Sequence, residues 1–488
     1  MRNLFKKRSV AYVVFMVSIT YISMLGSYVM ADDNRNIKGN YFYNPTVDDI
    51  PYKPSRNLHG ADYVIPDDDW KKEADKRIDK YRKANIKILI KNKAGFPLKN
   101  VAVRVSLKRH YFNFGAVATP GFGAGPKGEL KKKYFLKYFN AGGFGMSLKP
   151  TQCPEQGCGD GKAYKFRDIA EKDMIWLKKH NIKVRGHALI WDGAKFLHAN
   201  LKKINTDSSL SDEEKGNELF KRATAHFDHA IKKWDVFCWD VANEPRMNHL
   251  MDDYLQNCDT FVHWFKLADK LRKKYGKTPK LYYNENQILS CAKVGSYEDN
   301  RDIYKKRIQD LLDAKAPIEG IGFQFRFKMP ISPETVYERL HDYEEFNLPF
   351  QATEFELVSK GRLFEWDAAS RKKMIAEMMT LFMSHPLSDG FWHWSFTDNN
   401  PSLKNQKKKP YALFSWDGKP RAEMEQWIKM MEVDFNTNVQ LKTDAKGYIN
   451  LRGFKGIYEV TVGGSSKGAS TKKVVISLKE DVKTSITY

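Results

Sequence analysis

The sequence predicts a (β/α)8 barrel with a small accessory β-sandwich. From about residue 111 to residue 432, apolar strand-like runs alternate with helical segments, in eight strand-then-helix units. Several of these strands end in polar side chains, as expected at the active face of such a barrel. After residue 433 the pattern changes to short alternating strands separated by Gly and Asp/Lys turns, which is typical of a β-sandwich. A chain of 488 residues has room for both parts.

Residues 1–31 have the features of a targeting segment. Residues 1–8 are basic, and residues 9–31 contain no charged side chain. This pattern indicates a signal peptide, and the apolar run is long enough to serve as a membrane anchor if it is not cleaved. We therefore expect a secreted protein, extracellular or periplasmic, with a membrane as partner only if the segment remains.

Residues 32–110 are expected to form a lead-in that ends in β-strands. The lead-in contains a charged helix at 71–84 and two strands at 86–90 and 101–105, with turn residues between them. In the tail, strands are expected at 439–441, 448–451, 457–462, 473–477 and 484–487. Because a sheet this small is marginal alone, we expect the N-terminal strands to complete it.

The barrel elements follow in order between these two parts. Strands are expected at 112–117, 142–148, 182–190, 237–243, 281–284, 318–325, 348–354 and 390–394. Helices are expected at 129–139, 164–180, 211–234, 261–275, 304–314, 333–346, 368–385 and 421–431. The alternation of short apolar runs with longer segments of helical periodicity supports these assignments.

The chain is strongly basic, with a formal net charge of +23. We interpret this charge as a lysine-rich solvated surface, to which the runs at 131–133 and 407–409 belong; attraction to acidic polysaccharide is the functional alternative. The sequence contains no nucleic-acid recognition motif, so we expect no nucleic-acid partner.

Five cysteines permit disulfides but leave at least one thiol unpaired. Cys153 and Cys158 could bridge a local loop, Cys258 and Cys291 are the other possible pair, and Cys238 is expected in the core. The Cys and His spacing resembles no zinc site, so we expect no metal.

Two glutamates stand at the ends of apolar strands about 110 residues apart. Glu244 follows an apolar run and Asn243, and Glu354 closes a second such run. Parallel barrel strands present their C-terminal ends on one face, which would bring the two carboxyls together. Cleavage of a glycosidic bond needs one carboxylic acid to protonate the leaving oxygen and one carboxylate to attack or to activate water.

The other strand ends carry amides, indoles and charged groups, which suit binding of sugar hydroxyls and stacking on pyranose rings. In chain order they are Lys149, His187, Trp191, Asp192, Asn243, Asn284, Glu285, Gln324, Arg326, Trp394 and Asp398. The expected partner is therefore a polysaccharide or oligosaccharide.

Over about residues 112–431 the chain resembles glycoside hydrolase family 10, the endo-β-1,4-xylanases, which are retaining (β/α)8 enzymes. Six motifs carry the resemblance in the family's order: Arg-Gly-His-Ala-Leu-Ile-Trp at 185–191, Trp-Asp-Val-Ala-Asn-Glu at 239–244, Leu-Tyr-Tyr-Asn-Glu-Asn at 281–286, Gly-Ile-Gly-Phe-Gln at 320–324, Thr-Glu-Phe-Glu at 353–356 and Trp-Ser-Phe-Thr-Asp at 394–398.

The resemblance implies that Glu244 is the general acid/base and Glu354 the nucleophile, about 5–5.5 Å apart in a retaining enzyme. It also implies that Asn243 holds the sugar 2-hydroxyl. By the same resemblance, Lys149, His187, Gln324 and Trp394 shape the sugar site, and we expect Trp191, Asn284 and Arg326 to bind substrate as well. It implies cleavage of internal β-1,4 linkages of a plant-type polysaccharide such as xylan, without a cofactor, and we expect a monomer.

Two departures from the family pattern leave the substrate open. The second strand keeps Lys149 but lacks the neighbouring Glu, Asn and Trp, and Arg326 stands where the family has His. The loop at 151–162 could rebuild the lost contacts. Glu356 is an alternative nucleophile, although its register fits a downstream Asp of the family. The rival functions are hydrolysis of another β-glycan or oligosaccharide, and a non-catalytic carbohydrate-binding protein.

Overall fold

The computed structural model describes residues 69–118, 121–150, 161–197, 199–256, 259–292, 294–358, 364–398, 412–463 and 471–488. The targeting segment, most of the loop at 151–162, the lysines at 407–409, and Cys153, Cys158 and Cys258 lie outside these residues. Within the described ranges, no helix is long and apolar enough to cross a membrane.

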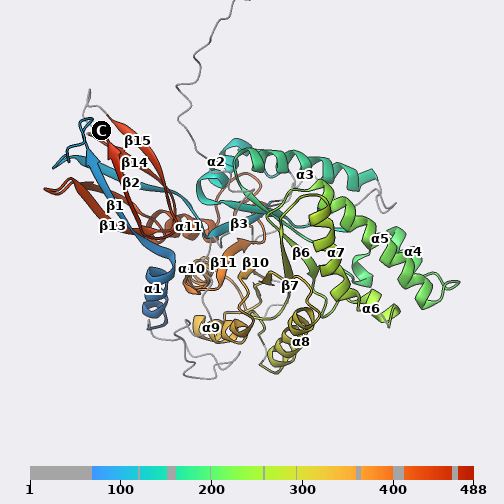
Figure 1. Ribbon diagram of the computed structural model, residues 1–488. Helices are drawn as coiled ribbons and strands as arrows, with labels where there is room; N and C mark the ends of the chain where they lie inside the picture. The colour runs from blue at the N-terminus through green and yellow to red at the C-terminus, as the bar shows by residue number, and fades with distance from the viewer. Residues whose placement is uncertain are drawn as a thin grey trace, which may run out of the picture. The chain divides into compact units, whose positions relative to one another are not determined.

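Eight parallel strands close into a barrel, which confirms the predicted fold (Figure 1). In order around the barrel they are β3 (Asn113–Ala118), β4 (Ala141–Phe144), β5 (Lys183–Gly186), β6 (Cys238–Asn243), β7 (Lys280–Glu285), β8 (Gly320–Phe323), β10 (Phe350–Leu357) and β11 (Ser388–His393). The last strand pairs with both β10 and β3, and this double pairing closes the ring. A two-residue strand, β9 (Arg326–Phe327), extends the edge of β10.

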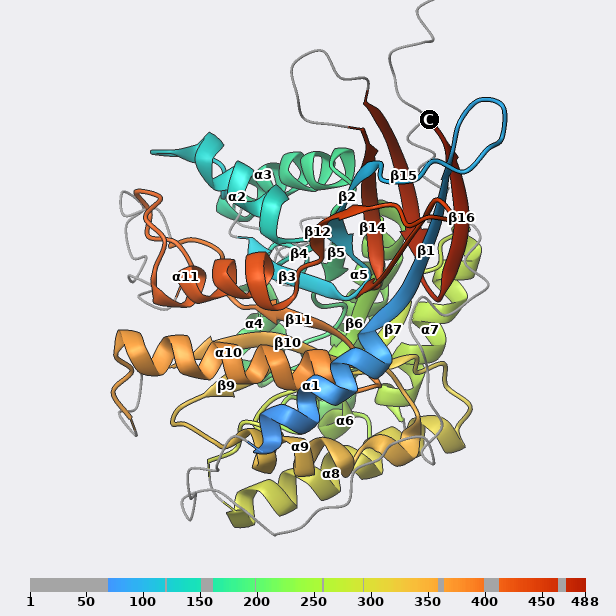
Figure 2. The same cartoon turned by 90° about the vertical axis from the view of Figure 1, so that its left-hand side faces the viewer.

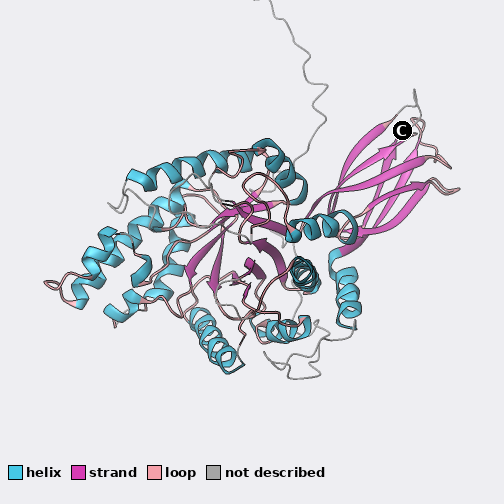
Figure 3. Ribbon diagram, turned by 180° about the vertical axis from the view of Figure 1, so that it is seen from behind, coloured by secondary structure: helices cyan, strands magenta, loops and turns pink. Residues whose placement is uncertain are grey.

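The barrel strands lie inside a layer of helices (Figure 3). These are α2 (Gly128–Tyr138), α3 (Gly161–Lys179), α4 (Ala199–Asn205), α5 (Asp212–Lys233), α6 (Leu250–Tyr254), α7 (Thr260–Lys274), α8 (Val294–Asp313), α9 (Pro333–His341), α10 (Ala368–Ser384) and α11 (Ala422–Lys429). Capping side chains explain where α5, α7, α9 and α10 begin. At α5, Ser211 accepts a hydrogen bond from the Glu214 backbone, and the Glu214 side chain bonds back to the Ser211 backbone.

Three predicted strands end earlier than expected. The observed ends are Phe144, Gly186 and Phe323, whereas the apolar pattern continues to residues 148, 190 and 325. Most residues beyond these ends are still buried, so their apolar character reflects packing above the barrel, whereas Met146 is exposed. The candidate site residues His187 and Gln324 lie in these segments, and Lys149 directly follows the first of them.

The two ends of the chain build the accessory sandwich together, as predicted. One sheet has the order β13 (Tyr448–Phe454), β1 (Lys83–Lys91), β16 (Val482–Thr487), and Figure 2 shows β1 beside β16. The other has the order β12 (Asn438–Lys442), β2 (Ala102–His110), β14 (Gly456–Val462), β15 (Lys472–Leu478). Ile88 of β1 and Val460 of β14 lie in one buried cluster between the sheets. The tail strands therefore need the N-terminal strands for their core.

Helix α1 (Asp69–Arg82) joins this sandwich to the barrel. The buried Arg82 guanidinium donates to the carbonyl oxygens of Met383 (2.8 Å), Ser388 (2.6 Å) and His385 near the start of β11. Burial lowers the pKa of Arg82 to about 10, which leaves it protonated at neutral pH. A permanent cation thus ties the strand that follows α1 to the barrel wall.

Two side-chain predictions have opposite outcomes. Cys238 is fully buried, as expected. The prediction that Lys131 is solvated is wrong, because its side chain is buried. Its ammonium donates to the Ala124 carbonyl oxygen and lies 4.5 Å from the Trp416 ring centre. The reason is helical geometry, because α2 turns Lys131 onto the same face as the core residue Phe135.

Candidate active site

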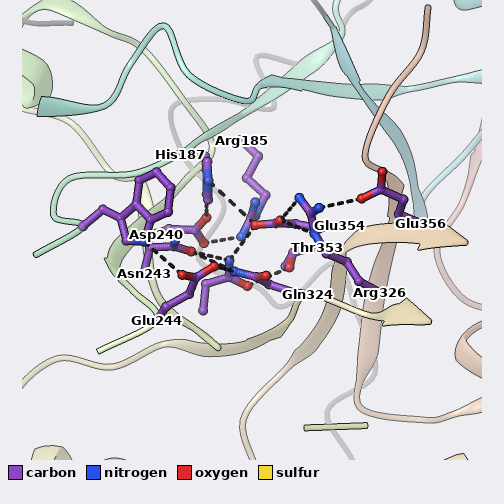
Figure 4. A network of polar contacts seen from close by, with 12 residues as sticks. Arg185, His187, Asp240, Asn243, Glu244, Gln324, Arg326, Thr353, Glu354 and Glu356 are labelled. Atoms are coloured by element: carbon purple, nitrogen blue, oxygen red, sulfur yellow. Dashed lines mark hydrogen bonds and ion pairs between the residues drawn. The ribbon is translucent and has the colours of Figure 1, made fainter. Parts of the chain in front are cut away.

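Glu244 lies immediately after β6, in a backbone conformation that a non-glycine residue adopts rarely. Its φ is +56°, and its backbone N–H donates to the Asn284 carbonyl oxygen (2.9 Å). Its carboxylate accepts hydrogen bonds from Gln324 Nε2 (2.6 Å), Trp191 Nε1 (3.0 Å) and Asn248 Nδ2 (3.1 Å). Three neutral donors therefore hold the side chain, and Figure 4 shows one of them, Gln324, beside Glu244.

Glu354 lies within β10 and is held differently. Its side chain is 2% exposed, and its Oε2 accepts from Arg326 Nε (3.1 Å) and from a terminal guanidinium nitrogen of the same residue (2.8 Å). Its Oε1 accepts from Asn284 Nδ2 (3.2 Å) and lies 3.7 Å from His187 Nε2. Glu354 therefore lies against a permanent cation that donates two charge-assisted hydrogen bonds to one of its oxygens.

Arg326 bridges two carboxylates. Besides Glu354 it donates to Glu356 Oε2 (2.5 Å), and its guanidinium carbon lies 4.4 Å from the Trp394 ring centre. Burial lowers the pKa of Arg326, but the two carboxylates outweigh this effect and raise it overall. Both glutamates share this partner, but only Glu354 lines the cavity described below, whereas the alternative nucleophile Glu356 does not.

An amide network links the two glutamates (Figure 4). Thr353 Oγ1 donates to Asn284 Oδ1 (2.6 Å), which orients the amide so that its nitrogen donates to Asn243 Oδ1 (2.8 Å) as well as to Glu354. Gln324 reaches Asn243 (3.4 Å) and Glu244 from the other side. The strand ends of β6, β7 and β10 are therefore held in one geometry.

His187 is a buried neutral imidazole beside Glu354. Burial, with the nearby cations Lys149, Arg185 and Arg326, lowers its pKa well below the ordinary value. Its Nδ1 hydrogen-bonds to Asp240 Oδ2 (2.6 Å), and Arg185 holds the other oxygen of Asp240. In the tautomer with Nδ1 as the donor to Asp240, Nε2 carries a lone pair, and this buried atom has no hydrogen-bond partner among the described residues. It is available to accept a hydrogen bond from a ligand hydroxyl.

Lys149 is buried next to the two glutamates. Its ammonium lies 3.6 Å from the Trp191 ring centre, and its side chain is 3% exposed. Burial lowers its pKa to about 8, although Glu354 and Glu244 oppose that change. A lysine that is costly to charge, and that lies in a cavity wall, is characteristic of a functional site.

We predict that Lys149→Met stabilises the fold at pH 7 while lowering activity. The folded-state pKa of about 8 is below the unfolded value of 10.5, so the charged lysine destabilises the folded state, and this cost is fully present below pH 8. Removing that penalty should raise the free energy of unfolding by about 1–3 kcal/mol at pH 7. The gain should shrink as pH rises from 8 to 10.5, and urea unfolding at pH 7 and 9.5 measures it. Equal differences at both pH values would contradict the assignment.

Two cavities meet at Glu244. One, of about 390 Å³, is lined by Glu354, Lys149, Trp191, Gln324, Arg326 and Trp394 among others. The other, of about 400 Å³, is lined by Lys195, Met247 and Asn248. Only the first contains Glu354, whereas Glu244, Asn286 and Gln287 border both. A chain-like ligand that occupied both cavities would place the junction between two of its units at Glu244.

Three other strand-end candidates have structural partners. Asp192 accepts from the Met251 backbone of α6 (2.7 Å), Glu285 accepts from the backbones of Asn286 (2.9 Å) and Arg246 (3.1 Å), and Asp398 pairs with Arg421. They support loops and do not join the two glutamates. The sequence analysis did not predict Asn248 as a site residue. Its position four residues after Glu244 could have indicated that its side chain lies near that carboxylate.

A closed β/α barrel with two carboxylates in one cleft at its strand ends defines a class, the barrel glycoside hydrolases. The family model described as glycosyl hydrolase family 10 matches residues 104–429, and the chain belongs to this family. The solved xylanase 10B from Thermotoga petrophila RKU-1 in complex with xylobiose shares the fold, with a TM-score of 0.51 and 18% identity over 66% of this chain and 95% of that one.

Two curated relatives match most of the chain at low identity. Endo-1,4-beta-xylanase 1 of Arabidopsis thaliana is 25% identical over 84% of the chain and 39% of its own length. Anti-sigma-I factor RsgI6 of Acetivibrio thermocellus is 22% identical over 82% of the chain and 47% of its own length. The chain thus spans less than half the length of both relatives.

Proposed function

We propose that this protein is a retaining glycoside hydrolase that cleaves internal β-1,4 linkages of xylan. The observation that carries the proposal is the unequal environment of the two glutamates. Glu354 is bound by the permanent cation of Arg326, while the partners of Glu244 are neutral donors. Two carboxyls in one cleft with such different partners suit the roles of nucleophile and acid/base.

The reaction follows from these roles. Glu354 attacks the anomeric carbon while Glu244 protonates the glycosidic oxygen, so that the bond to the leaving sugar breaks and a glycosyl ester forms. Glu244, now a carboxylate, then takes a proton from water, and the water oxygen displaces Glu354 from the anomeric carbon. Two inversions at that carbon retain its configuration, and no cofactor takes part.

The cavities at Glu244 indicate how a glycan would lie. The sugar that is attacked occupies the cavity with Glu354, and the leaving portion of the chain occupies the cavity with Met247. In the first cavity, His187 Nε2 accepts a hydrogen bond from a sugar hydroxyl, while Asn243 and Lys149 are placed to bind other hydroxyls. Trp394 offers its indole to the sugar beside Arg326.

Family membership and the names of the relatives support xylan, and the apolar segment at 9–31 supports export to a compartment where such a polymer is found. The second candidate is a family member that acts on another β-glycan. Arg326, a larger and permanently charged group where the family has His, favours this candidate.

The test is hydrolysis of a panel of β-glycans, read as new reducing ends and as the anomeric proton signal of the first product. We expect release from β-1,4-xylan with a β-anomer as the first product. Initial release of the α-anomer would overturn the retaining mechanism. Cleavage of other β-glycans but not xylan would favour the second candidate, and no cleavage of any glycan would remove the hydrolase proposal.

A further inference from the structure

Lys328 places a surplus positive charge at the cavity that holds Glu354. Of the charged residues lining this cavity, Lys149, Arg326 and Lys328 are cations, and Glu244 and Glu354 are anions. Arg326 is held by Glu354 and, behind the cavity wall, by Glu356. Lys149 is buried against Trp191 and is attracted by both catalytic glutamates. Lys328 forms no ion pair within the described part of the chain.

The surplus of positive charge in the cavity lining is larger when the enzyme is in the protonation state that starts the reaction. Glu244 must carry a proton when it acts as the acid, and it is then neutral. The cavity lining then has three cations and one anion, and Glu356 provides a second anion only through Arg326. A neutral sugar cannot compensate Lys328, whereas a ligand with a carboxylate can.

The position of Lys328 indicates which part of a bound glycan would carry that carboxylate. Lys328 follows the short strand β9, beside Val358, whose backbone N–H donates to the Phe327 carbonyl oxygen (2.8 Å). The backbone at the site is therefore fixed by the sheet. Lys328 is exposed, while Lys149 and Glu354 are 3% and 2% exposed. An exposed cation in the lining fits a group that projects from the glycan chain better than the ring being attacked.

We propose that Lys328 is a specificity-determining residue that binds the carboxylate of an acidic side group on the β-glycan. This inference rests on the proposed hydrolase function and narrows its substrate to a β-1,4-glycan that carries uronic acid substituents. The net charge of +23 would assist the encounter with such a polymer, in a salt-dependent manner.

The experiment compares xylan bearing uronic acid side groups with the same polymer after its carboxyl groups are reduced to hydroxymethyl groups. We expect wild-type kcat/KM to be about three- to tenfold higher on the acidic polymer, the effect of one charge-assisted contact at a partly solvated site. Lys328→Gln should remove this difference by raising KM on the acidic polymer alone. Lys328→Arg should keep it.

Controls separate this site from overall charge. Lys270→Gln removes an exposed lysine from helix α7, outside both cavities, and should behave as wild type on both polymers. Equal wild-type rates on the two polymers, or an equal effect of Lys328→Gln on both, would overturn the inference. Faster cleavage of a polymer built entirely of β-1,4-linked uronic acids would also overturn it, by placing the carboxylate in the backbone.

The inference and the proposed function can fail separately. If the wild type cleaves neither polymer, the hydrolase proposal fails. Retardation of the protein in gels containing each polymer then still tests Lys328. Stronger retardation by the acidic polymer that is lost in Lys328→Gln would support the carboxylate site, and equal retardation would refute it.

Discussion

Replacing Glu354 by Ala is expected to lower kcat on β-1,4-xylan by at least about 10⁴-fold, because the variant has no group to form the glycosyl ester. The loss should be similar on aryl xylosides with good leaving groups, since attack at the anomeric carbon is still missing. Added azide should restore turnover from the opposite face and yield an α-glycosyl azide, which NMR identifies.

Glu244→Ala is the matched comparison. It should cost about 10²–10⁴-fold on xylan, where the leaving sugar needs a proton, and much less for the first step on an aryl glycoside with a good leaving group. Azide should here yield the β-glycosyl azide. If both variants gave the same azide anomer, or if Glu354→Ala kept activity on aryl glycosides, the assigned roles would be wrong.

The second large effect is expected from Arg326→Met. Glu354 and Glu356 are each 2% exposed, and both would lose their cation. Leaving buried carboxylates unpaired costs about 3–5 kcal/mol, so the free energy of unfolding at pH 7 should fall by an amount of that order. Activity should fall as well, because Glu354 loses two hydrogen bonds that orient it. Urea unfolding and kcat on xylan measure the two effects.

Two further variants give this prediction its controls. Arg452→Met removes an arginine paired with Asp79 on an exposed surface and should cost less than about 1 kcal/mol. Adding Glu356→Gln to Arg326→Met should recover part of the lost stability, since one unpaired carboxylate is gone. A loss no greater than that of Arg452→Met would show that Arg326 does not hold the two glutamates.

Much of the site could be anticipated from local sequence. Glu244 and Glu354 stand at the ends of apolar runs, and a parallel barrel brings such ends together whatever the intervening loops contain. The accessory sandwich was also predictable, because five short strands cannot bury a core without the strands near Ile86 and Val103.

Other features of the fold and the site could not be predicted from local sequence patterns. Lys131 belongs to a run of lysines that is typical of a solvated surface, yet its position on helix α2 places its side chain in the interior. Asp192 and Glu285 have the composition of site residues, yet backbone amides take up their carboxylates. The apolar residues after β4, β5 and β8 look like continuous strand, yet the regular strands end before them. Leu189 and Ile190 still donate backbone hydrogen bonds to Asp240 and Val241 of β6, and of these apolar residues Met146 lines the cavity with Glu354.

The sequence by itself determined the order of the elements and the residues at the strand ends, since period and turn chemistry act over a few neighbours. Only the tertiary structure decided which of those residues meet. Arg326 joins Glu354 to Glu356, Lys149 lies against Trp191, and Lys328 remains without an ion pair among the described residues. The physical reason is that such contacts depend on the closure of the barrel, which brings together side chains from strands distant in the chain.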